Sequence, residues 1–211
     1  MEIKKFTFGP FQENTFVLYD KTKECVIVDP GCYDAYEQKD LSDFITNENL
    51  KPVHLLNTHC HLDHIAGNLF VFEKYGLKPQ LHELDLPIFN MQEQSSLLYG
   101  LSCEKSPLPE KFLKEGCSIV FGNTVLEVIF APGHSPGHVV FFDRLGNSVI
   151  TGDVLFYNSI GRTDLPMGNH DLLITSIKNK IFSLGDQVKV YCGHGPETTI
   201  GFERKTNPFL I

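Results

Sequence analysis

The sequence predicts an α+β protein built as a four-layer αββα sandwich, with two mixed sheets packed face to face and helices outside. Three observations predict this. Short apolar runs typical of strands come in two blocks, stretches with helical spacing accompany each block, and Gly, Pro, Asn or Asp residues separate the runs. No internal repeat, low-complexity tract or linker interrupts the 211 residues, so we predict one domain over residues 1–211.

The first block of strands has three helical stretches attached to it. Its predicted strands are Phe6–Phe8, Thr15–Tyr19, Cys25–Val28 and Val53–Leu56. Asp34 is a suitable N-cap for a helix that carries Leu41, Phe44 and Ile45 on one face. The spacing of apolar residues predicts two more helices, over Ile65–Tyr75 and Leu84–Met91.

The second block contains two predicted hairpins and one long helix. Its predicted strands are Ile119–Phe121, Val125–Phe130, Val139–Phe142, Val149–Ile150 and Val188–Tyr191. Gly122-Asn123 and Leu145-Gly146-Asn147 are typical hairpin turns between neighbouring runs. Helical spacing predicts a helix over Asn169–Leu184 with Asn169 as its cap. Ser95–Glu115 fits neither pattern, and we interpret it as a surface insertion that forms either a loop or a lid.

Composition excludes several classes of partner. Lys and Arg number 18 against 26 Asp and Glu, a formal charge of −8, which argues against nucleic acid or an anionic membrane as partner. No apolar run has the length of a signal peptide or of a membrane span. The six cysteines are scattered without a CxxC pair, as is typical of reduced thiols. We therefore expect a cytoplasmic location.

The segment Asn57–His64 carries the clearest chemical signal. It reads NTHCHLDH, which places His59, His61, Asp63 and His64 in a loop between an apolar strand and a helix. The first two histidines can face one cation, and the other two residues offer oxygen and nitrogen ligands to a second. Because each zinc takes about four ligands, one loop cannot complete two sites.

Three later segments can supply the remaining ligands. Each is an apolar strand followed by a glycine and then one ligand residue, which is His134, Asp153 or His194. Ligand sites commonly lie outside the carboxyl ends of strands in sheets that helices cover. A purely structural zinc site is usually closed and rich in cysteine, whereas these seven ligands are all His or Asp. The pattern therefore indicates a catalytic metal site.

The order HxHxDH, His134, Asp153, His194 resembles the metallo-β-lactamase-fold hydrolases, and within them the glyoxalase II-like group. The matching segments are VDPG, THCHLDH, APGHSPGHVVFF, TGDVLF, GRTDLPMG and CGHGPETTIGFERKTNPFL. The resemblance runs nearly end to end and is greatest to small type II glyoxalases without the C-terminal helical domain. It implies the metallo-β-lactamase fold that the strand and helix pattern already predicts as a four-layer sandwich.

The resemblance also implies roles for the site residues. His59, His61 and His134 would bind one metal, Asp63, His64 and His194 the other, and Asp153 would bridge them. We expect two Zn²⁺ per chain, although the same ligands accept Fe or Mn. A hydroxide shared by the two metals would be the nucleophile, and Asp63 would orient it and handle its proton as the catalytic residue. Asp29 would steady the histidine loop from behind.

Other chemically notable residues receive structural interpretations. His54 lies in a strand, His82 and His170 lie near helix starts, and we expect structural or capping roles for them. We predict a buried hydrogen-bonding role for His138 and packing roles for Cys60 and Cys192. Arg162 forms either an ion pair with Asp164 or a substrate contact, and these alternatives stay open. For Tyr157 we favour packing over a hydrogen bond to substrate.

The predicted function is hydrolysis of a small-molecule acyl thioester or related ester, such as S-lactoylglutathione. Full-length glyoxalase II enzymes hold glutathione largely through the C-terminal helical domain, and only 17 residues follow His194 here, so another acyl substrate is also expected. The alternative is a persulfide dioxygenase with one Fe(II) on His59, His134 and Asp153. The GHGPETT segment favours the hydrolase. β-Lactamase activity is not expected, and the oligomeric state stays open.

Overall fold

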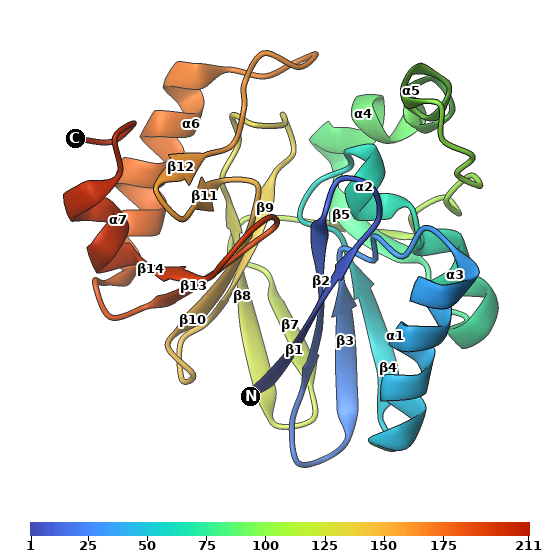
Figure 1. Cartoon of the computed structure of the whole chain (residues 1–211). Coiled ribbons are helices and arrows are strands. Elements are labelled where there is room, and N and C mark those ends of the chain that lie inside the picture. The colour runs from blue at the N-terminus through green and yellow to red at the C-terminus, as the bar shows by residue number, and fades with distance from the viewer.

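Two six-stranded sheets face each other at the centre of the molecule, with helices on their outer sides (Figure 1). The computed structural model describes residues 1–211. The first sheet contains, in spatial order, β1 (Glu2–Phe8), β2 (Glu13–Tyr19), β3 (Glu24–Val28), β4 (Lys51–Leu56), β5 (Pro79–His82) and β6 (Lys111–Leu113). The first three strands pair antiparallel and the last four parallel, so the sheet is mixed.

The second sheet is also mixed, because β10 and β13 pair parallel while its other neighbours pair antiparallel. Its strands are, in spatial order, β14 (Thr198–Thr199), β13 (Lys189–Cys192), β10 (Ser148–Gly152), β9 (Val139–Asp143), β8 (Thr124–Phe130) and β7 (Ser118–Phe121). A small hairpin of β11 (Leu155–Phe156) and β12 (Ser159–Ile160) follows β10. Both predicted hairpin turns are present, between β7 and β8 and between β9 and β10.

Alternation along the strands produces three apolar layers. In β2, Phe16 and Leu18 face the second sheet, where they pack in one cluster with Phe141 of β9. Val17 faces the other way and packs with Leu41. Since successive side chains of a strand point to opposite faces, a strand that is apolar at every position fits only between two packed layers.

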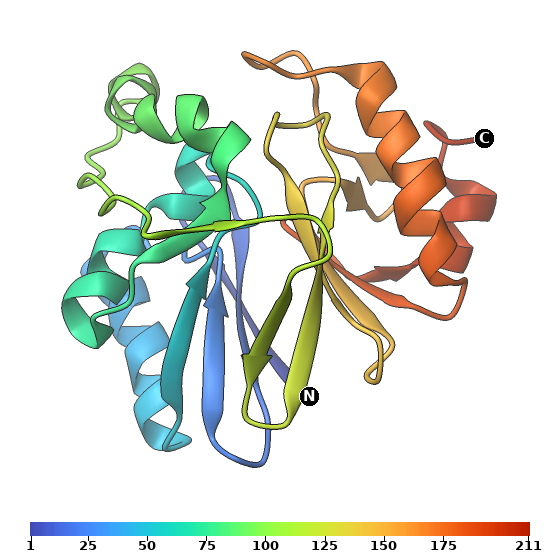
Figure 2. The same cartoon turned by 180° about the vertical axis from the view of Figure 1, so that it is seen from behind.

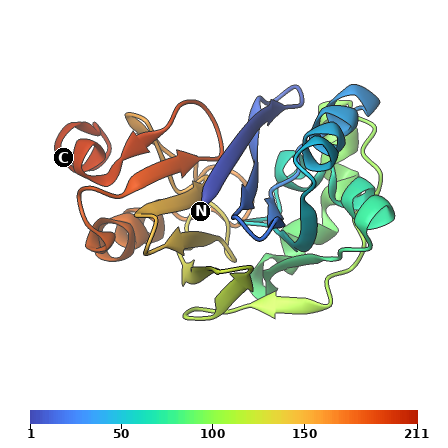
Figure 3. The same ribbon diagram turned by 90° about the horizontal axis from the view of Figure 1, so that it is seen from below.

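Helices complete the outer layers, as seen from below in Figure 3. The first sheet is covered by α1 (Ala35–Asn47) and α3 (Asn68–Tyr75), the second by α6 (His170–Ser176) and α7 (Ile200–Thr206). The predicted caps are confirmed, since Asp34 accepts from the amides of Tyr36 and Glu37, and Asn169 accepts from that of Leu172. The predicted αββα sandwich of two mixed sheets is therefore confirmed.

The prediction of one continuous helix over Ile65–Tyr75 is wrong. The chain instead forms α2 (Leu62–Ile65) and α3, with Gly67 between them. The Gly67 amide donates to the carbonyl of Pro30, and a Cβ at this glycine would lie 2.4 Å from Cys32 Sγ. A contact with the loop after β3 thus interrupts the helix, which local spacing cannot reveal. The helix predicted at Asn169–Leu184 is α-helical only over α6. A π turn (Ile177–Ile181) and a 3₁₀ turn (Phe182–Leu184) follow it.

The interpretation of Ser95–Glu115 as a surface insertion without regular structure is also wrong. Its start belongs to α5 (Gln92–Tyr99), which follows a 3₁₀ turn (Glu83–Asp85) and α4 (Leu86–Asn90). Its end contains β6, a three-residue edge strand too short to have a readable period. Figure 2 shows α4 and α5 at the same end of the molecule as the loop before α6. None of the helices is both long and apolar enough to span a membrane.

Candidate metal centre and active site

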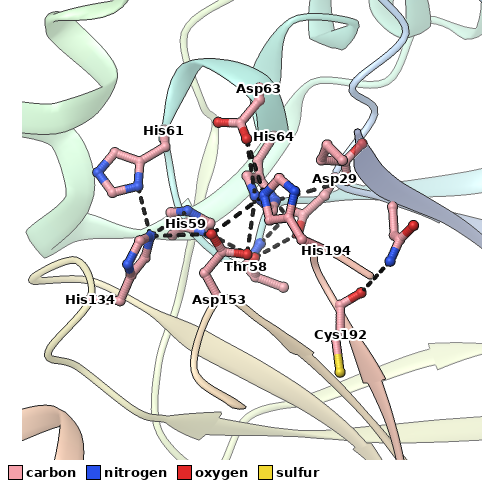
Figure 4. Close-up of polar contacts among 12 residues, drawn as sticks. Asp29, Thr58, His59, His61, Asp63, His64, His134, Asp153, Cys192 and His194 are labelled. Carbon is pink, nitrogen blue, oxygen red and sulfur yellow. Dashed lines mark hydrogen bonds and ion pairs between the residues drawn. The ribbon is translucent and has the colours of Figure 1, made fainter. Parts of the chain in front are cut away.

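The seven side chains predicted to bind metal lie together at one end of the two sheets (Figure 4). The segment after β4 supplies His59 and His61, and the first turn of α2 supplies Asp63 and His64. The other three residues follow β8, β10 and β13, and they are His134, Asp153 and His194. The predicted placement at strand ends is therefore confirmed.

A first trio consists of three imidazoles. His61 Nδ1 lies 2.8 Å from His134 Nε2, which in turn lies 3.2 Å from His59 Nε2. Burial and the neighbouring imidazoles lower the pKa of His59 well below its usual value. Burial and the nearby His134 lower the pKa of His61 to about 3. Both rings are neutral at pH 7, the form in which an imidazole nitrogen binds a cation.

A second trio adds a carboxylate to two imidazoles. Asp63 Oδ2 lies 3.2 Å from His194 Nε2 and 3.8 Å from His64 Nε2. Burial disfavours a charged ring at His64, but the carboxylates of Asp153, Asp63 and Asp29 outweigh it and raise its pKa. The second trio thus differs from the first in holding a carboxylate, which favours a positive charge on the imidazole beside it.

Asp153 lies between the two trios. Its Oδ2 is 3.4 Å from His134 Nε2 and 3.5 Å from His194 Nε2, while its Oδ1 is 3.4 Å from His64 Nε2. One carboxylate oxygen therefore borders an imidazole of each trio, so Asp153 would be placed to contact a cation held by either one.

Two unsatisfied atoms test whether this site fits metal ions. His64 Nε2 and Asp153 Oδ1 are buried and have no hydrogen-bond partner. Buried polar atoms in native proteins nearly always have a partner, so these two indicate a group that the protein side chains do not provide. The donor set of five imidazoles and two carboxylates suits divalent Zn, Fe or Mn. The residues present therefore fit two cations.

Hydrogen bonds to the ring nitrogens that face away from the site fix the orientations of His64 and His134. Fully buried Asp29 accepts from the Thr58 amide at 2.7 Å, from the Thr58 hydroxyl at 2.6 Å and from His64 Nδ1 at 3.0 Å. The predicted role of Asp29 in steadying the histidine loop is confirmed. His134 Nδ1 donates to the Arg162 carbonyl at 2.7 Å. These bonds leave the other ring nitrogen of each histidine free to face the site.

Sequence reasoning missed Glu13, a fully buried carboxylate beside the second trio. Its Oε2 accepts from the Thr15 hydroxyl at 2.8 Å, while Oε1 has no hydrogen-bond partner and lies 3.9 Å from His64 Nδ1. Burial raises the pKa of this carboxyl well above its usual value. No local pattern in the sequence marks Glu13, because its position depends on a β-bridge to His194, far along the chain.

Sequence reasoning also missed Asp85, because no local pattern marks it. It is fully buried and joins two loops of the first trio by accepting from the Cys60 amide at 2.6 Å and the Gly137 amide at 2.7 Å. Cys60 lies between His59 and His61, and Gly137 lies three residues after His134. Asp85 therefore sets the distance between the loops that carry the first trio.

We expect Asp85→Ala to destabilise the protein by about 2–5 kcal/mol, because it leaves two buried N–H groups without an acceptor. Urea unfolding of the metal-free protein, followed by circular dichroism, measures this. Glu83→Ala, at an exposed position of the same 3₁₀ turn, is the matched control. A loss below about 0.5 kcal/mol, the size typical of a neutral surface substitution, would contradict the role given to Asp85.

The predicted structural roles of His54, His82, His138, Cys60 and Cys192 agree with the structure, whereas no contact supports the role predicted for His170, the exposed first residue of α6. Buried His138 accepts at Nε2 from the Asp153 amide at 3.1 Å, and His82 caps the 3₁₀ turn through the Leu84 amide. Cys60 and Cys192 pack in apolar clusters.

The structure also places Arg162, for which the sequence leaves two alternatives, and Tyr157, for which it favours packing. Arg162 makes two 2.7 Å hydrogen bonds to Asp164 and also lines the cavity beside the cluster. Tyr157 stacks on Phe202, with ring centroids 5.2 Å apart, and is not among the residues that line the cavity.

A cavity of about 590 Å³ opens directly beside the two trios. His61, Asp63, His134, Asp153 and His194 form its floor. This volume lies within the range of small-molecule sites. Part of α5 forms a wall, so the segment beginning at Ser95 contributes to the site.

The model of the metallo-beta-lactamase superfamily matches residues 8–194, which include all seven predicted ligands. The chain belongs to this superfamily. Two superfamily relatives align with the whole chain. Hydroxyacylglutathione hydrolase GloC of Haemophilus influenzae is 35% identical, over 100% of this chain and 98% of the relative. Probable metallo-hydrolase YqgX of Bacillus subtilis is 36% identical, over 100% and 98%.

Solved structures of the superfamily share this fold. TTHA1623 in a di-iron-bound form has a TM-score of 0.89 at 39% identity and covers 98% of this chain and 100% of its own. BLEG-1, described as a B3 metallo-beta-lactamase, has a TM-score of 0.88 at 37% identity, covering 99% of both chains. ETHE1 from Myxococcus xanthus has a TM-score of 0.77 at 26% identity, covering 99% of this chain and 84% of its own. The single-domain assignment over residues 1–211 stays a prediction.

Proposed function

We propose that the protein is a dinuclear metal-dependent hydrolase of the glyoxalase II-like group that cleaves acyl thioesters such as S-lactoylglutathione. The observation that carries the proposal is the pair of trios sharing Asp153 on the floor of one cavity. The name of the GloC relative supports the reaction class. We assign His59, His61 and His134 to one metal, and Asp63, His64 and His194 to the other.

The proposed metals are two Zn²⁺, with Fe as the alternative that the di-iron form of TTHA1623 supports. When bound, two divalent cations would lower the pKa of a water to near neutral and polarise the acyl carbonyl. Burial keeps His59 neutral, and the hydrogen bonds of Asp29 and of the Arg162 carbonyl turn His64 and His134 toward the site.

Asp63 is the proposed catalytic residue. Its side chain is 18% exposed and lines the cavity, so it reaches a water that lies over the floor. Its carboxylate orients this water and accepts a proton while the water oxygen forms the new C–O bond. The C–S bond then breaks, and the departing thiolate takes the proton, so that water and thioester become a carboxylic acid and a thiol.

The test combines metal analysis with release of thiol. We expect purified protein with two metals to release thiol from S-lactoylglutathione, to lose this activity with a chelator and to regain it when Zn²⁺ is added. Absence of release with two metals bound would reject this substrate. A chromogenic cephalosporin should run in parallel, because BLEG-1 is described as a β-lactamase, and cleavage of the lactam alone would reject the thioesterase proposal.

The second candidate is the mononuclear iron dioxygenase. The specific observation in its favour is the likeness to ETHE1, together with the grouping of His59, His134 and Asp153. One iron per chain and consumption of O₂ on a glutathione persulfide would favour it. Two metals and thiol release from a thioester under anaerobic conditions would exclude it.

A further inference from the structure

The cavity beside the metal centre has two apolar walls. One wall comes from α4, α5 and the residue between them, and the other from the β11–β12 hairpin and the loop that follows. The apolar residues concerned are Ile88, Met91 and Leu98 on the first wall and Phe156, Ile160 and Leu165 on the second. An acyl carbonyl placed over Asp63 and Asp153 would therefore have its carbon chain between two hydrophobic surfaces.

Leu98 leaves apolar surface of the first wall open to water. Its side chain lines the cavity although it is 79% exposed. An edge-to-face contact of Tyr99 with Phe11, at 5.1 Å between centroids, ties this end of α5 to the loop between β1 and β2. An apolar ligand in the cavity would cover Leu98 and remove its surface from water, which is favourable in proportion to the area covered.

The same cavity has few cationic side chains that could bind an anionic ligand. Arg162 is the one Lys or Arg among the residues that line it, and its guanidinium is already engaged by two 2.7 Å bonds to Asp164. Apart from Tyr99, the remaining charged or titratable groups belong to the metal centre. The two carboxylates of a glutathione moiety would therefore find no free cationic side chain on the walls.

We infer that the cavity receives an apolar acyl chain, so that the preferred substrate is a medium-chain acyl thioester of an uncharged thiol, not a glutathione thioester of a small hydroxy acid. This inference rests on the proposed thioester hydrolysis and specifies its substrate class. Since burying one methylene is worth about a fourfold change in affinity, kcat/KM should rise by about that factor per buried methylene until the walls are filled.

The test is a series of N-acetylcysteamine thioesters, acetyl, butyryl and hexanoyl, compared with S-lactoylglutathione on the metal-loaded full chain. We expect hexanoyl to exceed acetyl in kcat/KM by about 10²-fold or more, from the summed effect of four methylenes. We also expect hexanoyl to exceed S-lactoylglutathione. A flat series, or a preference for S-lactoylglutathione, overturns the inference while leaving thioester hydrolysis in place. Cleavage of none of the four thioesters overturns both.

Leu98→Ser and Leu97→Ser form a matched pair for the same assay. The two leucines are neighbours on α5 and are 79% and 77% exposed, but only Leu98 lines the cavity. We expect Leu98→Ser to reduce the hexanoyl-to-acetyl ratio by about fivefold to tenfold, and Leu97→Ser to leave it unchanged. Equal ratios in both variants and the wild type would overturn the assignment of this wall to the acyl chain.

Discussion

Asp153→Asn should lower kcat/KM by about 10³-fold, the size of effect expected when a group that organises charge in the transition state is lost. The amide keeps the volume of the carboxylate but offers a single oxygen and no negative charge. Nε2 of His134, of His64 and of His194 each lies 3.4–3.5 Å from one of the two oxygens of Asp153. An amide cannot offer an oxygen at both of these positions. The measurements are thioester hydrolysis and metal content per chain.

The metal content separates a bridging role from a merely structural one. We expect the variant to hold one metal or fewer where the wild type holds two, with unchanged far-UV circular dichroism. Asp171→Asn, which removes an exposed carboxylate in the first turn of α6, is the control for charge alone. Two bound metals and activity within about tenfold of the wild type would contradict the bridge.

Asp29→Asn should weaken binding at the second metal site by about 10–100-fold, the range found for groups that orient metal-binding histidines. Asp29 accepts a hydrogen bond from His64 Nδ1 at 3.0 Å, so the neutral ring carries its proton on Nδ1 and turns Nε2 toward the site. An Asn oriented to accept from the Thr58 amide presents its NH₂ group to this ring. His64 must then carry its proton on Nε2, where it blocks a cation.

The measurements are calorimetric titration of the metal-free protein with Zn²⁺ and the ¹⁵N shifts of the His64 ring, which report the tautomer directly. Glu13→Gln is the matched control, because Glu13 Oε1 lies 3.9 Å from the same Nδ1 without a hydrogen bond to it. We expect the control to weaken binding less and to leave the tautomer unchanged. Wild-type affinity and tautomer in Asp29→Asn would contradict the role of Asp29.

The spacing of apolar residues predicted helices and strands correctly where the element was long enough to show a repeating pattern. The runs that became β2, β3 and β8 and the capped starts of α1 and α6 were correctly located. Short elements such as β5, β6, β14 and α7 were missed because two to seven residues show no clear period. The interruption at Gly67 depends on Pro30 and Cys32, which lie more than thirty residues earlier in the chain.

The sequence by itself determined which side chains gather at the candidate metal centre, because each ligand segment follows an apolar strand and ligand sites commonly lie outside the carboxyl ends of strands. Only the tertiary structure decided what surrounds them. Glu13 and Asp85 take part through contacts with residues distant in sequence, and α5 becomes a cavity wall by packing beside the cluster. Local sequence motifs identify the ligand residues. The residues that hydrogen-bond to the ligands and the shape of the cavity depend on long-range packing, which leaves no periodic pattern in the sequence.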